Sequence, residues 1–317
     1  MPALIQGISS ALINPRLQSP IEPLAIPVYL LLVTWTCVTI AMIGLTSFTW
    51  NGADLNGLII ALGIFVVGGV ILRRYGLRIS GALEAFGLIS LGSLLSTISM
   101  SLLSALSFPM TDELLVKADK LLGFDWLNFW NLLNQQPSHM GTLTTIYHSI
   151  NWQPVVLFSI LFMIGRDERC WTMLTAWMIG LVFTAVLFPF FPAEAAFNHY
   201  GVIQPQGSSA ANFLPTLEAL RDGSLRDINR SSVQGMVTFP SFHAAAGVYF
   251  AWAAAGVKWL RVPFIVLNIA MIISAIPVGG HYLVDLIGGC LLAGVTIFAA
   301  IRIQSLVPRI WATESNG

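Results

Sequence analysis

The chain has 317 residues, of which 56% are hydrophobic and 9% are charged, and its formal net charge is zero. Soluble domains carry about 25% charged residues, so this composition excludes an ordinary soluble globule. The apolar runs are long rather than short and alternating, which predicts an all-α polytopic membrane protein instead of a β-barrel. A neutral chain gives no support for nucleic-acid binding. The cysteines have no paired spacing and predict neither a disulfide framework nor a zinc site; they are Cys37, Cys170 and Cys290.

About eight apolar segments follow one another, each near the length that crosses a hydrocarbon core. The first two run from Ala25 to Leu45 and from Leu58 to Leu72, after a polar, interfacial segment 1–23. The third, Ile79 to Leu106, is rich in Gly and Ser, which favours close helix packing. The region from Thr111 to Gln136 is amphipathic and is expected to lie in the membrane interface.

The later spans complete the predicted architecture. The fourth ends near Gly165, and the others cover Trp171 to Phe191, Ser241 to Lys258, Val262 to Val278 and Tyr282 to Ile303. We therefore divide the chain into an N-terminal segment with two accessory spans (1–78), a six-span catalytic core with interfacial helices (79–304) and a cytoplasmic tail (305–317). Four tryptophans are expected in an aromatic belt at the membrane surface: Trp50, Trp126, Trp130 and Trp152.

Basic residues of the short loops fall on one side of the membrane if there are eight spans. They are Arg73, Arg74, Arg78, Arg166, Arg169, Lys258, Arg261, Arg302 and Arg309. The positive-inside rule makes that side cytoplasmic. The polar stretch 192–239 and the starts of the sixth and eighth spans then face the other side. We predict an integral protein of the inner or plasma membrane whose polar site is extracytoplasmic.

Two short segments hold most of the polar groups that are useful for chemistry, Phe239 to His243 and Gly279 to Asp285. His281 and Asp285 are spaced i, i+4, so a helix would place them on one face, about 6 Å apart along its axis. A carboxylate in that position can accept a hydrogen bond from one imidazole nitrogen and leave the other free to attack. His243 lies about one span, one turn and one returning span earlier, so both imidazoles are expected at the same membrane face.

A phosphate ester needs donors for its oxygens, a nucleophile in line and an acid for the leaving alcohol. Pro240-Ser241 predicts a helix start whose amides face a bound anion, and Ser241 adds a hydroxyl donor. Gly279-Gly280 offers a second bare stretch of backbone. The Pro-Ser and Gly-Gly pairs, taken singly, more commonly just mark the ends of helices. A histidine with a carboxylate one turn later, inside an apolar span, is energetically costly and usually functional. The whole set indicates phosphoryl transfer.

The segment Pro240-Ser241-Phe242-His243 resembles the proline-serine-x-histidine motif of the type 2 phosphatidic acid phosphatase superfamily. Ser274, His281 and Asp285 are spaced as in that family's last motif, serine-arginine-x5-histidine-x3-aspartate. The match is close from Pro240 onward and looser from Ile79. The resemblance implies a six-span core that needs no metal or other cofactor.

Residue roles follow from the same resemblance. It implies that His281 is the nucleophile that forms a phosphohistidine and that Asp285 orients it. It also implies that His243 is the acid that protonates the leaving alcohol and that Ser241 contacts the phosphate. Gly280 and Tyr282, within the same segment, are further candidates for substrate binding.

Two departures from the family pattern remove phosphate-binding cations. Ala275 stands where the last motif has arginine, and the lysine-x6-arginine-proline first motif is absent. Both shift the resemblance towards the branch that includes fungal inositol phosphorylceramide synthase, whose histidine-tyrosine-x-x-aspartate segment is similar to residues 281–285. Guanidinium is the best bidentate partner for phosphate, and Arg230 and Arg221 are the leading replacements. Pairing with Glu218, Asp222 and Asp227 is the alternative role for these arginines.

We therefore predict a lipid phosphatase or phosphotransferase that acts on a lipid phosphate or phosphodiester at the extracytoplasmic face, with an inositolphosphotransferase-like reaction favoured. A simple lipid phosphate phosphatase is the alternative. A proton-coupled transporter is a different class, but the charges cluster at one face and no pair of broken helices occupies matching halves. Two histidines and a carboxylate could also bind iron or zinc. The Pro-Ser start and the Gly-Gly pair favour phosphate over a metal.

Overall fold

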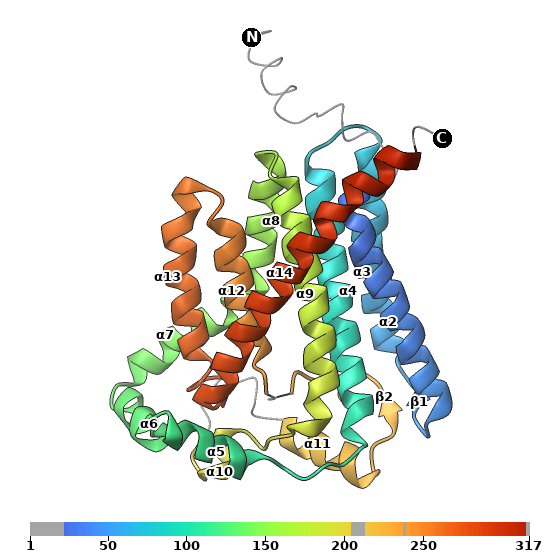
Figure 1. Ribbon diagram of the computed structural model, residues 1–317. Helices are drawn as coiled ribbons and strands as arrows, with labels where there is room; N and C mark the ends of the chain where they lie inside the picture. Colours follow the sequence, from blue (N-terminus) through green and yellow to red (C-terminus); the bar gives the residue numbers. More distant parts are fainter. Residues whose placement is uncertain (1–21, 204–212, 237–238, 315–317) are drawn as a thin grey trace.

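The computed structural model describes residues 22–203, 213–236 and 239–314. Long helices lie side by side in a bundle, and short helices cross one end of it (Figure 1). Among the described residues, five helices are long and apolar enough to cross a membrane. They are α2 (Ile26–Leu45), α3 (Ala53–Arg73), α4 (Ile79–Ser104), α9 (Asp167–Leu187) and α14 (Leu283–Glu314). The predicted all-α polytopic membrane fold is confirmed.

Three shorter helices run alongside the long ones in Figure 1. They are α8 (Gln153–Met163), α12 (Phe242–Ala254) and α13 (Lys258–Ser274). At 1.5 Å per residue they are about 17, 20 and 26 Å long. The predicted fourth span is not one helix. The chain instead forms α7 (Pro137–Tyr147), which lies at an angle to the bundle, and the short 3₁₀ helix η3 (His148–Asn151), before α8 begins with Pro154 in its first turn.

The end of the bundle where α14 begins is called the site end below. The amphipathic region folds there as α5 (Asp112–Leu121) and α6 (Trp126–Asn134), which lie across the bundle rather than along it (Figure 1). The polar stretch adds α10 (Ala196–His199), α11 (Phe213–Asp222) and the strand β2 (Asp227–Ile228), which pairs in parallel with β1 (Thr49–Trp50). The 3₁₀ helix η4 (Phe188–Phe190) ends α9. The site end is therefore covered by short segments that do not run the length of the bundle.

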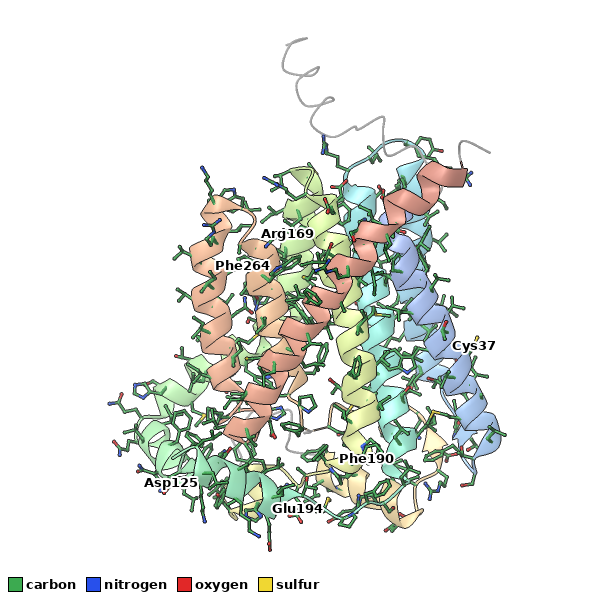
Figure 2. All side chains as sticks on the ribbon, viewed as in Figure 1. Cys37, Asp125, Arg169, Phe190, Glu194 and Phe264 are labelled. Carbon is green, nitrogen blue, oxygen red and sulfur yellow. The ribbon has the colours of Figure 1, made fainter. Side chains whose placement is uncertain are left out.

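The opposite end carries the turns α3–α4, α8–α9 and α12–α13, and α2 begins there after the 3₁₀ helix η2 (Pro23–Ala25) (Figure 1). In Figure 2 the basic residue Arg169 lies towards this end, whereas the acidic residues Asp125 and Glu194 lie at the site end. Helix α14 runs from one end to the other and continues past residue 304. The division of the chain at 78/79 and 304/305 stays a prediction, and most of the predicted interfacial segment 1–23 lies outside the described residues.

Small residues bring α3 and α4 into close contact, as the Gly- and Ser-rich pattern predicts. A Cβ atom at Gly69 would lie 2.7 Å from Glu84 Cβ, and one at Gly87 would lie 2.6 Å from a methyl of Val66. Such close backbone approach is how helices associate where lipid is the solvent. Glu84 forms a buried ion pair with Arg73 and accepts a hydrogen bond of 2.6 Å from Tyr29. This pair fixes α2, α3 and α4 together at the opposite end.

Candidate functional site

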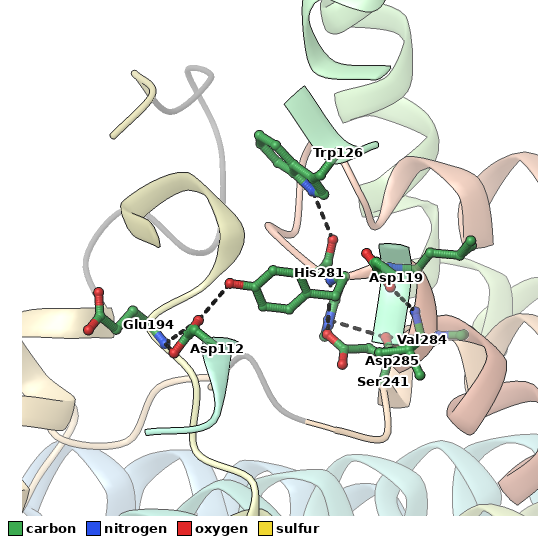
Figure 3. Close-up of polar contacts among 11 residues, drawn as sticks. Asp112, Asp119, Trp126, Glu194, Ser241, His281, Val284 and Asp285 are labelled. Carbon is green, nitrogen blue, oxygen red and sulfur yellow. Dashed lines mark hydrogen bonds and ion pairs between the residues drawn. The ribbon is translucent and has the colours of Figure 1, made fainter. Parts of the chain in front are cut away.

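His281 sits just before α14, and Asp285 lies in the first turn of that helix. The His281 Nδ1 atom is 3.1 Å from Asp285 Oδ2, which also accepts the backbone N–H of Tyr282 at 3.0 Å (Figure 3). Asp285 therefore reaches back to the residue that precedes the helix, as in the side-chain half of a capping box. Because its carboxylate accepts, the imidazole proton belongs on Nδ1, and Nε2 carries the lone pair.

Ser241 brings the start of α12 to the same point. Its hydroxyl oxygen accepts the backbone N–H of Ala244 at 3.4 Å, as a helix cap does, and lies 3.2 Å from His281 Nε2. Its own backbone N–H donates to the carbonyl of Asp285 at 2.9 Å. A Cβ atom at Gly289 would be only 2.1 Å from the Ser241 carbonyl oxygen, so glycine is needed there. The starts of α12 and α14 are thus held together around His281.

His243, in the first turn of α12, faces the same space. Its ring stacks on Tyr147 with centroids 4.0 Å apart and an interplanar angle of 8°. His243 and His281 line one cavity and lie close enough to interact electrostatically. The Nε2 atom of His243 is buried and has no hydrogen-bond partner among the described residues. The two imidazoles meet at one end of the bundle, as the spacing predicts.

The cavity has a volume of about 610 Å³ and is lined mainly by apolar side chains. It follows α4 from Phe86 to Met100, which is about 21 Å at the helical rise. Hydroxyl groups on its wall come from Ser90, Ser93, Ser96, Thr97 and Thr184. One end of the cavity carries two imidazoles and the rest is mostly apolar, which is a shape and polarity that suit a molecule with a polar head and an apolar tail.

Helix α5 holds the turn that carries His281 in place, and sequence reasoning missed this role. The carboxylate of Asp119 accepts the backbone N–H groups of Leu283 and Val284 at 2.9 and 2.8 Å. These are the first amides of α14, so a carboxylate from another helix caps it. Asp112 accepts the hydroxyl of Tyr282 at 2.8 Å and the backbone N–H of Glu194 at 3.0 Å (Figure 3).

The pattern of α5 contained a signal for this role. Its buried positions are Asp112, Leu115, Val116 and Asp119, which follow the i, i+3, i+4, i+7 spacing of a core-facing stripe. Two aspartates on such a stripe need partners. Burial raises the pKa of Asp119, and the two amide hydrogen bonds oppose that shift.

Trp126 is another support that the sequence analysis placed elsewhere. Its indole N–H donates to the backbone carbonyl of His281 at 3.1 Å, and its side chain is 1% exposed. Its ring is stacked between Trp130 and Tyr200, at centroid distances of 5.5 and 5.3 Å. Trp126 and Trp130 are expected in an aromatic belt at the membrane surface, but both are buried, because α6 packs this face against the chain.

Gly280 and Tyr282 have structural duties beside the site. Gly280 has a φ of +72°, and a Cβ atom there would lie 2.8 Å from the Phe197 ring, so the turn requires glycine. Tyr282 is fully buried with its hydroxyl on Asp112. The backbone amides at the start of α14 already donate to Asp285 and Asp119. The start of α12 is different, because Phe242 and His243 line the cavity there. The N-terminal end of α12 is therefore the helix end that can bind an anion in the cavity.

The two candidate arginines lie outside the cavity lining. Arg221 donates to the carbonyl of Phe108 at 2.7 Å, and its own carbonyl accepts the hydroxyl of Ser107. Arg230 is exposed. Their contact with phosphate stays a prediction. Within the described residues, no group of three or more His, Cys, Asp or Glu side chains is placed to hold a metal ion.

A comparison with known families finds one match. The family model described as PAP2 superfamily matches residues 113–299, which is more than half of the chain and includes α5 from its second residue onward and the start of α14. No curated protein and no solved structure matches. The matched range contains Ser241, His243, His281 and Asp285.

Proposed function

This chain belongs to the PAP2 superfamily, and from that membership we propose that it is an integral membrane lipid phosphatase or phosphotransferase with His281 as its nucleophile. The observation that carries the proposal is the orientation of His281. Its Nδ1 is held by Asp285, and its Nε2 lies 3.2 Å from Ser241 Oγ, on the wall of a cavity shared with His243. An imidazole fixed in this way is the activated nucleophile that phosphoryl transfer needs.

The proposed reaction has two steps. In the first, the Nε2 lone pair of His281 attacks phosphorus, and the bond from phosphorus to the leaving alcohol oxygen breaks. His243, which enters this step as the imidazolium, gives that oxygen a proton and becomes neutral. Asp285 stabilises the positive charge on the His281 ring. In the second, water or another alcohol loses a proton to His243 and attacks phosphorus, and the phosphorus–nitrogen bond breaks. Both residues return to their starting states.

The acceptor decides whether the enzyme is a phosphatase or a phosphotransferase. We favour an inositolphosphotransferase-like reaction, because Ala275 replaces the family's arginine and residues 281–285 are similar to the segment of that branch. The apolar cavity supports a lipid substrate, with Ser241 and the N-terminal end of α12 contacting its phosphate. Arg221 and Arg230 would add charge from the surface of the site end. A simple lipid phosphate phosphatase is the second reading.

We place the site end on the extracytoplasmic side, because the basic turns gather at the opposite end (Figure 1). Single cysteines at Asp125 and at Arg74, introduced in a chain whose own cysteines are replaced, should report this. A membrane-impermeant maleimide added to intact cells should label the cysteine at Asp125 and leave the one at Arg74 unlabelled. The reverse labelling would overturn the orientation and leave the chemistry untouched.

The catalytic proposal is tested on the purified chain with a panel of lipid phosphates and lipid phosphodiesters, with and without free alcohol acceptors. We expect head-group release or transfer that falls by at least about 10³-fold in His281→Gln. The exposed residue His139, on α7, gives the matched control, and His139→Gln should keep full turnover. Quenched wild-type enzyme should hold an acid-labile phosphoryl group that His281→Gln lacks. Full turnover in His281→Gln would exclude it as the nucleophile.

A further inference from the structure

A second cavity lies near the opposite end of the bundle, far from the imidazoles. It has a volume of about 370 Å³ and is bounded by the start of α9, the end of α12 and the later half of α14. Its charged and polar lining includes Arg166, Arg169, Glu168 and Gln304. Figure 2 shows Arg169 well separated from Glu194, which marks the site end. The proposed phosphoryl transfer makes no use of this cavity.

Two guanidinium groups line this cavity, those of Arg166 and Arg169, and a third, that of Arg261, lies near Arg169. Arg169 lies close enough to Arg166 and Arg261 for their positive charges to repel one another. In the part of the chain that the structure describes, none of the three forms an ion pair. Arg169 donates to the carbonyls of Trp252 and Ala253 at the end of α12, which carry only partial negative charge, so Arg169 has no ionised partner. A group of like charges at the end of a membrane bundle is relieved by a bound anion, and phosphate is the anion that guanidinium groups bind best.

Gln304 indicates that a ligand in this cavity should also carry a hydrogen-bond donor. Its side chain is 4% exposed, and its Nε2 donates to the Leu24 carbonyl and to the Thr175 hydroxyl, at 2.9 Å each. These partners fix the amide orientation, so Oε1 is an acceptor, and it is buried with no hydrogen-bond partner among the described residues. A buried acceptor without a donor is costly. Glu168, on the same wall, is a second acceptor. The cavity therefore suits a ligand that carries both a phosphate and a donor group.

Apolar side chains also lie at and beside the cavity. Trp252 and Ile301 line it, and Ile301 is 45% exposed beside Phe298, which is 60% exposed on α14. Acyl chains can lie along this outer face of α14, while a head group occupies the polar interior. Basic pockets between membrane helices are known sites for phospholipid head groups.

We propose that this cavity binds one phospholipid head group, with its phosphate on Arg166 and Arg169 and its terminal hydroxyl or ammonium group donating to Gln304 Oε1 and Glu168. The site is structural or regulatory and is independent of the proposed catalysis. Phosphatidylethanolamine and phosphatidylglycerol satisfy both requirements. Phosphatidylcholine has the phosphate but no donor, and soluble phosphoethanolamine has both groups but no acyl chains.

The test is thermal unfolding of the purified full chain in detergent with each of these four compounds, supported by native mass spectrometry. Phosphatidylethanolamine or phosphatidylglycerol should raise the Tm by about 2–5 °C and remain as one bound lipid. Arg166→Gln should abolish most of that shift. The side chain of Arg166 is exposed, so the variant should fold normally. Arg74→Gln removes the same charge from another exposed position at the same end and should keep the shift.

Each contrary outcome removes one part of the proposal. An equal shift with phosphatidylcholine would overturn the role of Gln304 Oε1 and Glu168 as acceptors. An equal shift with phosphoethanolamine would show that the ligand is a soluble phosphate ester rather than a lipid. Equal losses in Arg166→Gln and Arg74→Gln would show general attraction of anionic lipid to a basic surface instead of a site. The lipid site and the proposed catalytic site can be tested independently, because His281→Gln should lose turnover and keep the lipid-dependent Tm shift.

Discussion

The two ends of the bundle satisfy their helix termini with opposite charges. At the site end, the carboxylate of Asp119 accepts the first amides of α14. At the opposite end, Arg169 donates to the last carbonyls of α12, and Arg261 donates to the carbonyl of Ala255. Each charge complements the helix dipole that it faces. Carboxylates thus surround helix starts beside the imidazoles, and guanidinium groups surround helix ends away from them.

Because of this difference, the charges at the two ends are expected to affect different properties of the protein. Hydrogen bonds from α5 and α6 reach the turn that carries His281, so their loss is expected to move the imidazole that we propose as the nucleophile. The guanidinium groups hold helix ends near the other membrane face, so their loss weakens the bundle without touching the proposed nucleophile. Removing a charge should therefore change both turnover and stability at the site end, and stability alone at the opposite end.

The largest effect is expected at Arg73, whose side chain is 3% exposed and paired with the fully buried Glu84. Arg73→Gln leaves that carboxylate buried without its charge partner, which costs about 3–5 kcal/mol in the free energy of unfolding. Because the pair lies at the opposite end, turnover per folded molecule should stay within about twofold of wild type, as additivity of distant sites requires. Thermal unfolding and lipid head-group release measure the two quantities.

Arg74→Gln is the matched control, because Arg74 is the exposed neighbour of Arg73. Its free energy of unfolding should change by less than about 0.5 kcal/mol. A large loss of turnover per folded molecule in Arg73→Gln would contradict the separation between the two ends.

An intermediate effect is expected at Asp119. Asp119→Ala leaves the amides of Leu283 and Val284 without their acceptor, which costs about 1–2 kcal/mol of stability, as for other lost helix caps. The released turn displaces His281, so we expect turnover to fall by about 10- to 100-fold. Glu113→Gln, at an exposed position of the same helix, should change neither quantity. Unchanged turnover in Asp119→Ala would show that α5 does not position His281.

The pH dependence of the same residue sharpens the comparison. Burial raises the pKa of Asp119, so the native protein holds this proton at pH values where the unfolded chain has lost it. Its contribution to stability is therefore greatest at low pH and is lost as the pH rises through the raised pKa. Turnover should rise over that same window, because the ionised carboxylate accepts both amides. Asp119→Asn should flatten both trends, measured as Tm and as turnover between about pH 4 and 8.

The sequence predicted the five long apolar helices and the meeting of His243 with His281, because hydropathy and motif spacing report on segments that are local in the chain. It did not predict that Asp112 and Asp119 hold the His281 turn, since these contacts join residues more than 160 positions apart. The hydrophobic periodicity of one segment does not show which distant residue its polar side chains will contact. The two aspartates on the apolar stripe of α5 were the one local sign that partners were needed.

The break in the fourth span has a similar cause. The sequence predicts one span of ordinary length before Gly165, whereas the structure has the 3₁₀ helix η3 followed by the shorter helix α8. Pro154 in the first turn of α8 was the local signal for a new helix start. The break places Tyr147 against His243, with ring centroids 4.0 Å apart. A straight helix through this region was the expectation, whereas the observed turn supplies a wall of the cavity.

The smallest effect is expected at Trp126, whose indole N–H donates to the His281 carbonyl. Trp126→Phe keeps an aromatic ring against Trp130 and Tyr200 but removes one hydrogen bond, worth about 0.5–1.5 kcal/mol. The matched change Trp130→Phe, on the same buried face of α6, alters ring size without touching that carbonyl. Turnover should therefore fall by about two- to tenfold in Trp126→Phe and by less in Trp130→Phe, while both variants unfold at similar temperatures. If the two variants lose turnover equally, the ring packing of α6 rather than the hydrogen bond to His281 sets the position of the nucleophile.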